Sequence, residues 1–230
     1  MFFVVFTVEG KRVEVFPAAK PGCPVLYLHT VEDNGGAVYE AVQTRTGMDF
    51  SLVAVSRLDW NADLSPWAAP AVFAKGAPFS GGAGAYLALL LEKIVPQAES
   101  LLPPVSWRGI AGYSLAGLFA VYVLYQTGVF ENAACVSGSL WFPGIKAYVL
   151  SHSFCKKPRR LYFSLGNKEC ETHNRYMQCV QENTQAIEAF CRSQGIDTVF
   201  RLNPGNHFQN AVSRCADGIC WVLETPDTAK

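Results

Sequence analysis

One segment near the middle of the chain, Gly112-Tyr113-Ser114-Leu115-Ala116-Gly117, restricts the fold more than any other. Residues 107–112 have the composition of a buried strand, and residues 115–126 form an almost wholly apolar run typical of a helix. A serine at such a junction lies on a sharp turn that lifts its hydroxyl above the sheet, and small residues two positions before and after it let strand and helix approach. Gly112 and Ala116 meet this requirement. The pattern predicts that Ser114 is a nucleophile; a surface serine in a glycine-rich turn is the alternative.

Segments typical of strands alternate with segments typical of helices along the rest of the chain. The first two strands, joined at Gly10, predict an antiparallel hairpin. The later alternation predicts an α/β fold with a mainly parallel central sheet and helices on both faces, in which a site lies at the carboxyl ends of the strands. Pro96 is expected to end or kink its helix, and residues 59–84 are expected to form a long loop. The expected strands are 2–8, 12–16, 25–29, 50–55, 107–112, 133–137, 160–165 and 198–202, and the expected helices are 36–45, 85–98, 115–126, 174–194 and 209–223.

The composition narrows the classes of function. The chain has 230 residues, which predicts one domain spanning 1–230 with no separate lid domain. Its formal net charge is zero, so no binding to nucleic acid or to an anionic membrane is expected. No apolar run reaches the roughly 20 residues of a membrane helix. The apolar start, residues 1–8, is interpreted as a strand rather than a signal peptide.

The eight cysteines raise the question of metal sites and disulfides. They include no CxxC pair, and no histidine pair stands at ligand spacing, so no metal site is expected. Without a secretory signal, free thiols in a reducing compartment are the expectation, and the predicted location is cytoplasmic. Pairing among Cys170, Cys179 and Cys191 under oxidation is the alternative.

A serine needs a general base to act as a nucleophile, and the sequence offers four histidines. His207 follows the last expected strand and precedes the last expected helix, which predicts that it meets Ser114 at the same edge of the sheet. His29 is assigned to the oxyanion side of the site, in the loop after the first parallel strand. His152 and His173 are assigned to solvated loops or helix starts.

A carboxylate is expected to orient the imidazole and to follow the strand before the last one. Glu169 follows residues 160–165 at this distance and is the candidate. Glu171 is close behind, and Asp197 is a weaker choice because it precedes its strand. The alternative for Glu169 is an exposed loop carboxylate paired with Lys168.

Backbone amides are expected to stabilise the oxyanion. The Leu115 N–H begins the helix after the serine, and a second donor should come from the loop after the first parallel strand. Thr30 is the candidate for this second donor, with Val31 as the alternative. Several aromatic residues are expected in loops at the same sheet edge and are candidates for the walls of a substrate pocket, although they could equally belong to the core: Trp60, Trp67, Tyr113, Trp141 and Phe208.

Together these residues resemble those of the putative esterase family of α/β-hydrolases, which includes S-formylglutathione hydrolase, feruloyl esterases and siderophore esterases. The resemblance covers about residues 24–223 and implies the α/β-hydrolase fold and ester hydrolysis through an acyl-enzyme on a Ser–His pair. The chain departs from the family pattern at Ala116, where glycine is usual. It also has no clear aspartate after Leu165, so a Ser–His dyad is an alternative to a triad. The resemblance rests on residues 25–29, 58–61, 112–117, 137–141, 164–169 and 203–208.

The sequence therefore predicts a serine esterase that acts on a small carboxylic ester and uses neither a metal nor an organic cofactor. An acyltransferase or a thioesterase would share the same acyl-enzyme and is the first alternative. A binding module that kept the fold and lost catalysis is the second.

Overall fold

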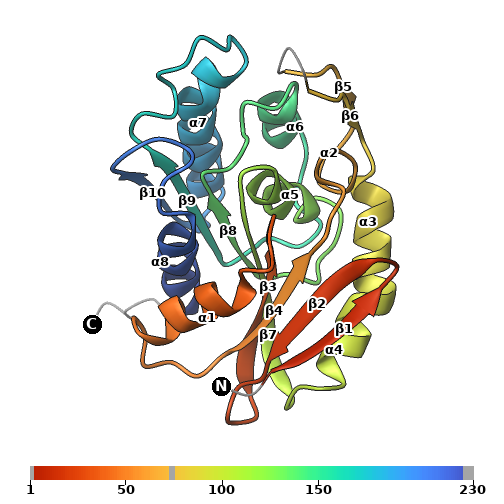
Figure 1. Cartoon of the computed structure of the whole chain (residues 1–230). Helices are drawn as coiled ribbons and strands as arrows, with labels where there is room; N and C mark the ends of the chain where they lie inside the picture. The colour runs from red at the N-terminus through yellow and green to blue at the C-terminus, as the bar shows by residue number, and fades with distance from the viewer. Residues whose placement is uncertain (1–2, 73–75, 225–230) are drawn as a thin grey trace, which may run out of the picture.

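A computed structural model of the chain describes residues 3–72 and 76–224. Its centre is an eight-stranded sheet in the order β1-β2-β4-β3-β7-β8-β9-β10 (Figure 1). β1 and β2 form the expected antiparallel hairpin, and β2 also pairs antiparallel with β4. The other pairings in this sheet are parallel, which confirms the predicted fold class. Its strands are β1 (Val4–Val8), β2 (Lys11–Phe16), β3 (Cys23–His29), β4 (Ser51–Ser56), β7 (Val105–Tyr113), β8 (Asn132–Val136), β9 (Arg160–Gly166) and β10 (Asp197–Asn203).

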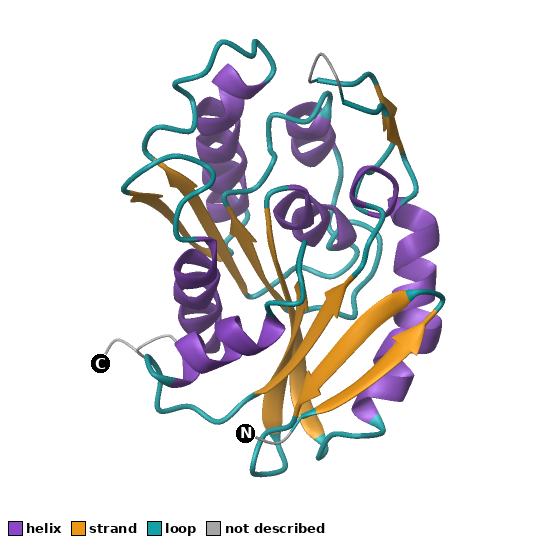
Figure 2. Cartoon of the chain, viewed as in Figure 1, coloured by secondary structure: helices purple, strands orange, loops and turns teal. Residues whose placement is uncertain are grey.

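Helices cover both faces of the sheet, as expected (Figure 2). Along β3, Leu26 and Leu28 pack on the face covered by α1 and α8, whereas Val25 and Tyr27 pack on the face covered by α3 to α7. This period of two is typical of a strand buried on both sides. The helices are α1 (Gly35–Gln43), α2 (Trp60–Asp63), α3 (Ala83–Leu89), α4 (Val95–Glu99), α5 (Leu115–Val123), α6 (Ile145–Ser151), α7 (Val180–Ser193) and α8 (Ala211–Leu223).

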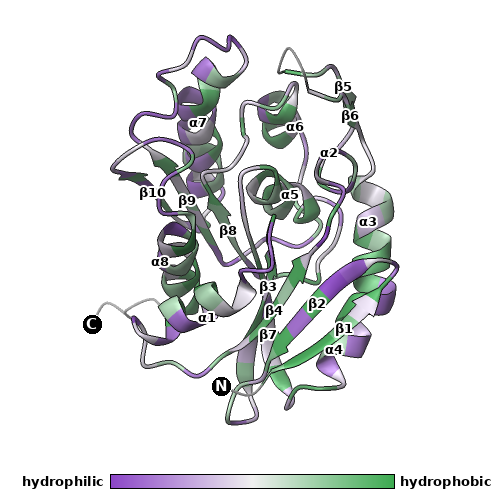
Figure 3. Ribbon diagram, in the orientation of Figure 1, coloured by the Kyte–Doolittle hydropathy of each residue, from purple (hydrophilic) through white to green (hydrophobic). Residues whose placement is uncertain are grey.

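Helix α5 lies at the centre of the molecule, which explains its uninterrupted apolar sequence. All of its residues are buried, so it has no solvent-facing stripe. Figure 3 shows the hydrophobic colour concentrated on α5 and the central strands, while the outer loops carry more of the hydrophilic colour. A helix held this firmly gives the turn before it a fixed position.

The helix that contains Pro96 does not end at the proline: a π-helical segment, Leu90–Ile94, precedes it, and the helix continues to Glu99, one residue beyond its expected end. Three other expectations about local structure differ from the structure. The loop 59–84 contains α2 and a small two-stranded sheet, β5 (Ala68–Ala69) with β6 (Phe79–Ser80). Helix α6 was not expected, and α7 begins six residues later than 174, after a 3₁₀ turn. Residue 2, at the start of the first expected strand, lies outside the described residues.

All eight cysteines are free, including Cys170, Cys179 and Cys191. Burial raises the pKa of Cys191 and of Cys215 to about 12, so these two thiols stay protonated near neutral pH. Their environment is that of small core residues.

Across the described ranges, no helix combines the length and the apolar character needed to cross a bilayer.

Candidate active site

The turn between β7 and α5 carries Ser114 in a strained backbone conformation. Its φ and ψ are 60° and −124°, a region that residues other than glycine rarely adopt. A Cβ on Gly112 would lie 2.4 Å from the backbone of Ala116, so only glycine fits at that position. Ala116 itself is accommodated, and its departure from the usual glycine leaves the turn intact. The residues after the turn are held by the packing of α5, which maintains the strain.

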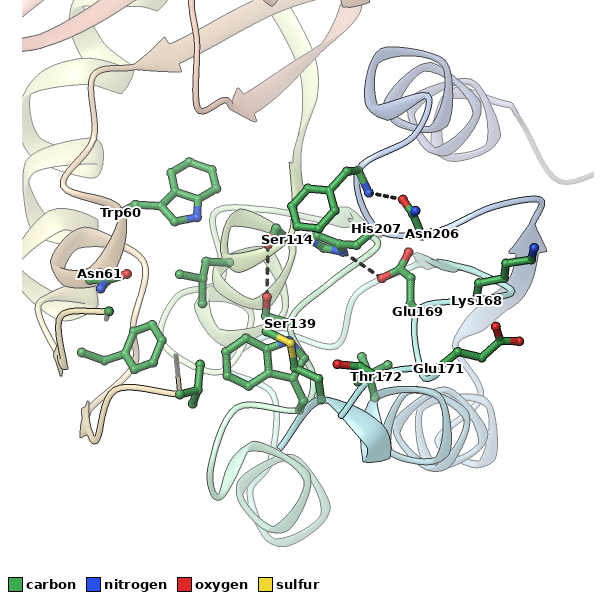
Figure 4. A pocket seen from close by; sticks show the side chains of 18 of the residues that line it. Trp60, Asn61, Ser114, Ser139, Lys168, Glu169, Glu171, Thr172, Asn206 and His207 are labelled. Carbon is green, nitrogen blue, oxygen red and sulfur yellow. Dashed lines mark hydrogen bonds and ion pairs between the residues drawn. The ribbon is translucent and has the colours of Figure 1, made fainter. Parts of the chain in front are cut away.

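Ser114, His207 and Glu169 form a continuous chain of hydrogen bonds. The Nε2 atom of His207 lies 3.0 Å from Ser114 Oγ, and its Nδ1 atom lies 2.8 Å from Glu169 Oε2. Figure 4 shows the imidazole between the hydroxyl and the carboxylate. The three residues come from the β7–α5 turn, the loop after β9 and the loop after β10, all at the carboxyl edge of parallel strands. The structure thus brings together the three side chains predicted to carry catalysis.

Glu169 is a buried carboxylate with a well-defined set of partners. Its side chain is 4% exposed, and its Oε1 atom accepts hydrogen bonds from Gly166 N–H at 2.5 Å and from Arg214 Nη1 at 3.2 Å. Burial alone would raise the pKa of Glu169. The hydrogen bonds from His207 and from Gly166 N–H stabilise the charged form and bring the pKa below its usual value. Glu169 is therefore ionised near neutral pH.

The alternative carboxylates and histidines lie elsewhere. Glu171 is exposed at the edge of the pocket, and Asp197 forms an ion pair with Arg160 at 2.8 Å. The ring of His152 stacks on Tyr148, and His173 is exposed. None of these four residues contacts the Ser114 hydroxyl, and the exposed His152 and His173 agree with their assignment to solvated positions.

The assignment of His29 to the oxyanion side of the site is wrong. Its side chain is buried in the core, edge-on to Tyr86 and to Phe119. Burial lowers its pKa to about 3, so it is a neutral core residue. Because side chains alternate along β3, a residue at the end of this strand faces the helices rather than the pocket.

The prediction for the second oxyanion donor also needs correction. The Thr30 N–H donates to Val55 O at 3.0 Å, because His29 and Val55 form the last parallel pair of β3 with β4 and the residue after it supplies the flanking hydrogen bond. Its hydroxyl donates to Glu32 O, so both donors of Thr30 are used within the loop. Leu115, the other candidate, carries the first amide of α5, and an amide in the first turn has no partner within its helix.

A pocket of about 460 Å³ opens beside the Ser114 hydroxyl. Trp60, Trp141 and Phe208 line it, as expected for three of the aromatic residues. Figure 4 shows Trp60 and Asn61 on the side opposite Lys168 and Glu171. Most of the remaining lining residues come from loops, although Phe79 lies in β6 and Val180 begins α7. The lining residues not named so far are Val72, Gly76, Ala77, Phe79, Ser139, Thr172, Met177, Val180 and Asn206.

Two of the aromatic candidates lie outside this lining. Tyr113 points to the opposite face of the sheet from α5, and its hydroxyl donates to His207 O at 2.7 Å. The assignment of Tyr113 as a pocket residue is therefore corrected to a contact behind the histidine. Trp67 packs against Phe142, and its indole N–H donates to Pro143 O. Side-chain alternation along β7 explains the first case, because the residue before Ser114 turns away from it.

Two residues near the reacting atoms were not predicted. Ser139 Oγ lies 3.3 Å from Ser114 Oγ and lines the pocket, while its own N–H donates to Ser114 O. Arg214, from α8, reaches Glu169 from behind. Ser139 belongs to segment 137–141, one of the segments on which the family resemblance rests, and this membership could have marked it as a candidate site residue. Arg214 lies in an ordinary amphipathic helix, where an arginine is normally solvent-exposed.

Comparison with known proteins agrees with this geometry. The model of the family described as "putative esterase" matches residues 13–199. An IroE-like serine hydrolase from Shewanella oneidensis superposes with a TM-score of 0.79 and 20% identity over 96% of this chain and 79% of the other. The siderophore hydrolase EstA from Aspergillus nidulans superposes with a TM-score of 0.77 and 17% identity over 96% of this chain and 93% of the other. The enterobactin esterase FES from Shigella flexneri superposes with a TM-score of 0.67 and 14% identity over 96% of this chain and 58% of the other.

No curated protein matches the chain in sequence. At these identities the solved structures establish the fold, and the family match establishes the kinship. That match covers most of the sheet and both the elbow and the acid loop. The chain belongs to the putative esterase family and is a carboxylic ester hydrolase with the α/β-hydrolase fold.

Proposed function

We propose that the chain hydrolyses esters of small molecules through an acyl-enzyme on Ser114, with His207 as general base and Glu169 as the third member of a triad. The main support for this proposal is the chain of hydrogen bonds from Ser114 Oγ through the His207 imidazole to Glu169. The strained φ of Ser114 adds support, because such strain persists only where the surrounding packing enforces it.

The mechanism follows from the protonation states of the triad. With Glu169 ionised, the imidazole proton of His207 lies on Nδ1 and the Nε2 lone pair faces Ser114 Oγ. His207 takes the hydroxyl proton as Ser114 Oγ bonds to the ester carbonyl carbon, and the C=O electrons move to oxygen. The proton then passes to the leaving alcohol as the C–O bond breaks. Water repeats the sequence on the acyl-enzyme and releases the acid.

The oxyanion needs donors that are in place before the reaction. We assign the first to the Leu115 N–H, which lies at the pocket and at the positive end of the α5 dipole. Since Thr30 N–H is engaged by Val55, we assign the second to the next amide of the loop, that of Val31. Losing one such donor typically costs about 10²–10³-fold in turnover.

The pocket favours a compact, mostly apolar ester. Trp60, Trp141, Phe79 and Met177 supply apolar walls, and Asn61 and Lys168 add polar groups on either side. A single domain without a separate lid would leave this site open to small or exposed ester groups. Because the structurally similar EstA is a siderophore hydrolase, a siderophore ester is one of the substrates to be tested.

The proposal predicts a covalent intermediate. A fluorophosphonate probe should label the wild-type protein, and a p-nitrophenyl ester should give a burst of p-nitrophenol close to one equivalent per enzyme wherever deacylation is slow. A series of p-nitrophenyl esters compared with acyl-CoA, with and without added alcohols, separates hydrolysis from acyl transfer. Absence of both labelling and turnover would instead favour the binding module.

Phe208 is predicted to bind substrate rather than to support the fold. Its ring is 90% exposed at the pocket edge and lies edge-on to His207 at 5.4 Å between centroids. Phe208→Ala should raise KM for an aromatic ester about fivefold with little change in kcat, because about 1 kcal/mol of ring contact is lost. Leu202→Ala, at an exposed apolar residue outside the pocket lining, is the matched control. Equal KM values in the two variants would remove Phe208 from the binding site.

A further inference from the structure

Arg214 is a buried cation directly behind the triad. Its side chain is 2% exposed, and its Nη1 atom lies 3.2 Å from each of three oxygens, those of Glu169 Oε1, Tyr113 OH and Ser137 Oγ. Its Nη2 atom donates to Pro204 O at 2.8 Å. Burying a guanidinium costs several kcal/mol unless its charge and its donors are matched. Within the described part of the chain, Glu169 is the one carboxylate that forms an ion pair with Arg214.

These contacts join the segments that build the site. Tyr113 ends β7, Ser137 follows β8, Glu169 follows β9 and Pro204 follows β10, so one side chain of α8 connects four neighbouring strand ends. The guanidinium lies close against the end of β9. A Cβ on Gly166 would lie 2.9 Å and 3.0 Å from the two Nη atoms, so a side chain at position 166 would displace the guanidinium.

Near neutral pH, Glu169 and Arg214 are the charged pair among the groups that surround Glu169. The groups that face it are His207 from the loop after β10, Arg214 from α8, Tyr113 from β7 and Cys135 from β8. Burial raises the pKa of Tyr113 and that of Cys135, so both are neutral. With His207 neutral, Glu169 and Arg214 carry the only charges among these groups, and they cancel.

We propose that Arg214 is a positioning residue that acts through Glu169: it holds the triad carboxylate ionised and aimed at His207, and thereby sets the pH below which activity is lost. This inference rests on the proposed triad. Without the guanidinium, Glu169 would be an uncompensated buried anion. Protonation of His207 would then neutralise it, so the imidazole would take up its proton at a higher pH.

The test compares Arg214→Gln, which removes the charge, with Arg214→Lys, which keeps it. The measurement is kcat/KM for a p-nitrophenyl ester from about pH 5 to about pH 9, per active site titrated with a fluorophosphonate. In Arg214→Gln the acidic limb of the pH–activity profile should move up by about one pH unit, the order of shift that a single nearby charge causes at a partly buried site. In Arg214→Lys the limb should stay within about 0.3 units of wild type, although kcat should fall a few-fold because the planar fork is lost.

A purely structural role predicts something else. It would lower thermal stability and the titrated fraction while leaving the limb of the Arg214→Gln enzyme unmoved, and that result would overturn the inference. If Arg214→Gln does not fold, Arg214→Met is measured in the same way, because it also removes the charge, fills a similar space and leaves Glu169 in place. Its acidic limb should move up by the same amount, and a limb that coincides with that of Arg214→Lys would overturn the inference. Failure of the wild type to react with the probe would instead count against the triad itself.

Discussion

Replacing Ser114 with alanine is expected to lower kcat for an ester by about 10⁴–10⁶-fold, the loss seen when the nucleophile of a serine hydrolase is removed. The acyl-enzyme cannot form without the hydroxyl, and the residual rate would come from the oxyanion donors and the pocket alone. The fold should persist, because the side-chain oxygen contacts only His207 and Ser139 among the described residues. The measurement is initial rate with a p-nitrophenyl ester together with fluorophosphonate labelling, which should vanish.

The chain supplies a matched control for this variant. Ser139 carries a second hydroxyl in the same pocket, 3.3 Å from Ser114 Oγ, and is 1% exposed. Ser139→Ala removes one hydroxyl from the same site and should keep full labelling, with kcat within about tenfold of wild type because a single hydrogen bond is lost. If Ser139→Ala abolished labelling while Ser114→Ala kept it, the nucleophile would have been assigned to the wrong serine.

The position of the triad could be predicted from the sequence because it depends only on topology. Each of the three residues follows a strand, and parallel strands bring their carboxyl ends to one edge whatever the details of packing. Ser114 needed one further feature, the glycine at position 112, and this is visible in the sequence. Glu169, the predicted carboxylate, stands where the family pattern has an aspartate, and it reaches His207 from a tight turn in which Gly166 N–H donates to its carboxylate.

Predictions that depended on register and side-chain direction failed. Whether Thr30 has a free N–H depends on the hydrogen-bond pattern at the end of β3, where the N–H of the residue after the last pair, His29 with Val55, still donates to Val55 O. Whether His29 and Tyr113 face the pocket depends on which face of each strand meets which helix. The sequence shows the alternation but not its phase relative to the site. His29 and Tyr113 therefore lie near Ser114 in the sheet, but their side chains face away from the pocket.

The pocket-lining residues other than Trp60, Trp141 and Phe208 could not be predicted, nor could Arg214, for a different reason. Loops 59–84 and 167–179 have no periodic pattern, so their side chains are placed by contacts far apart in sequence, such as that of Asn174 Nδ2 with Val72 O. Arg214 is set by a contact across 45 residues, and helical periodicity does not reveal which polar residue of α8 is buried. Its burial is explained only when Glu169 and Tyr113 are seen to converge on it.

The choice between a triad and a dyad rests on Glu169→Gln, which is expected to lower kcat by about 10³–10⁴-fold. Glutamine keeps the shape but loses the charge, and its amide N–H would donate to His207 Nδ1. The imidazole proton would then move to Nε2, which faces Ser114 and could no longer accept the hydroxyl proton. The measurement is kcat and kcat/KM near neutral pH for protein whose folded fraction is established by circular dichroism, because the variant leaves Arg214 as an unpaired buried cation.

Glu171→Gln is the matched control, since this carboxylate lies two residues further along the same loop, lines the same pocket and is exposed. It removes the same charge close to the site without touching the imidazole, so its kcat should stay within about twofold of wild type, as expected for a surface substitution. If Glu169→Gln were folded and equally active, the Ser–His pair would act as a dyad, and the 2.8 Å contact with His207 Nδ1 would serve only to pack the loop. A large loss confined to Glu169→Gln would instead require a triad, because general electrostatic effects of a nearby carboxylate would appear in both variants.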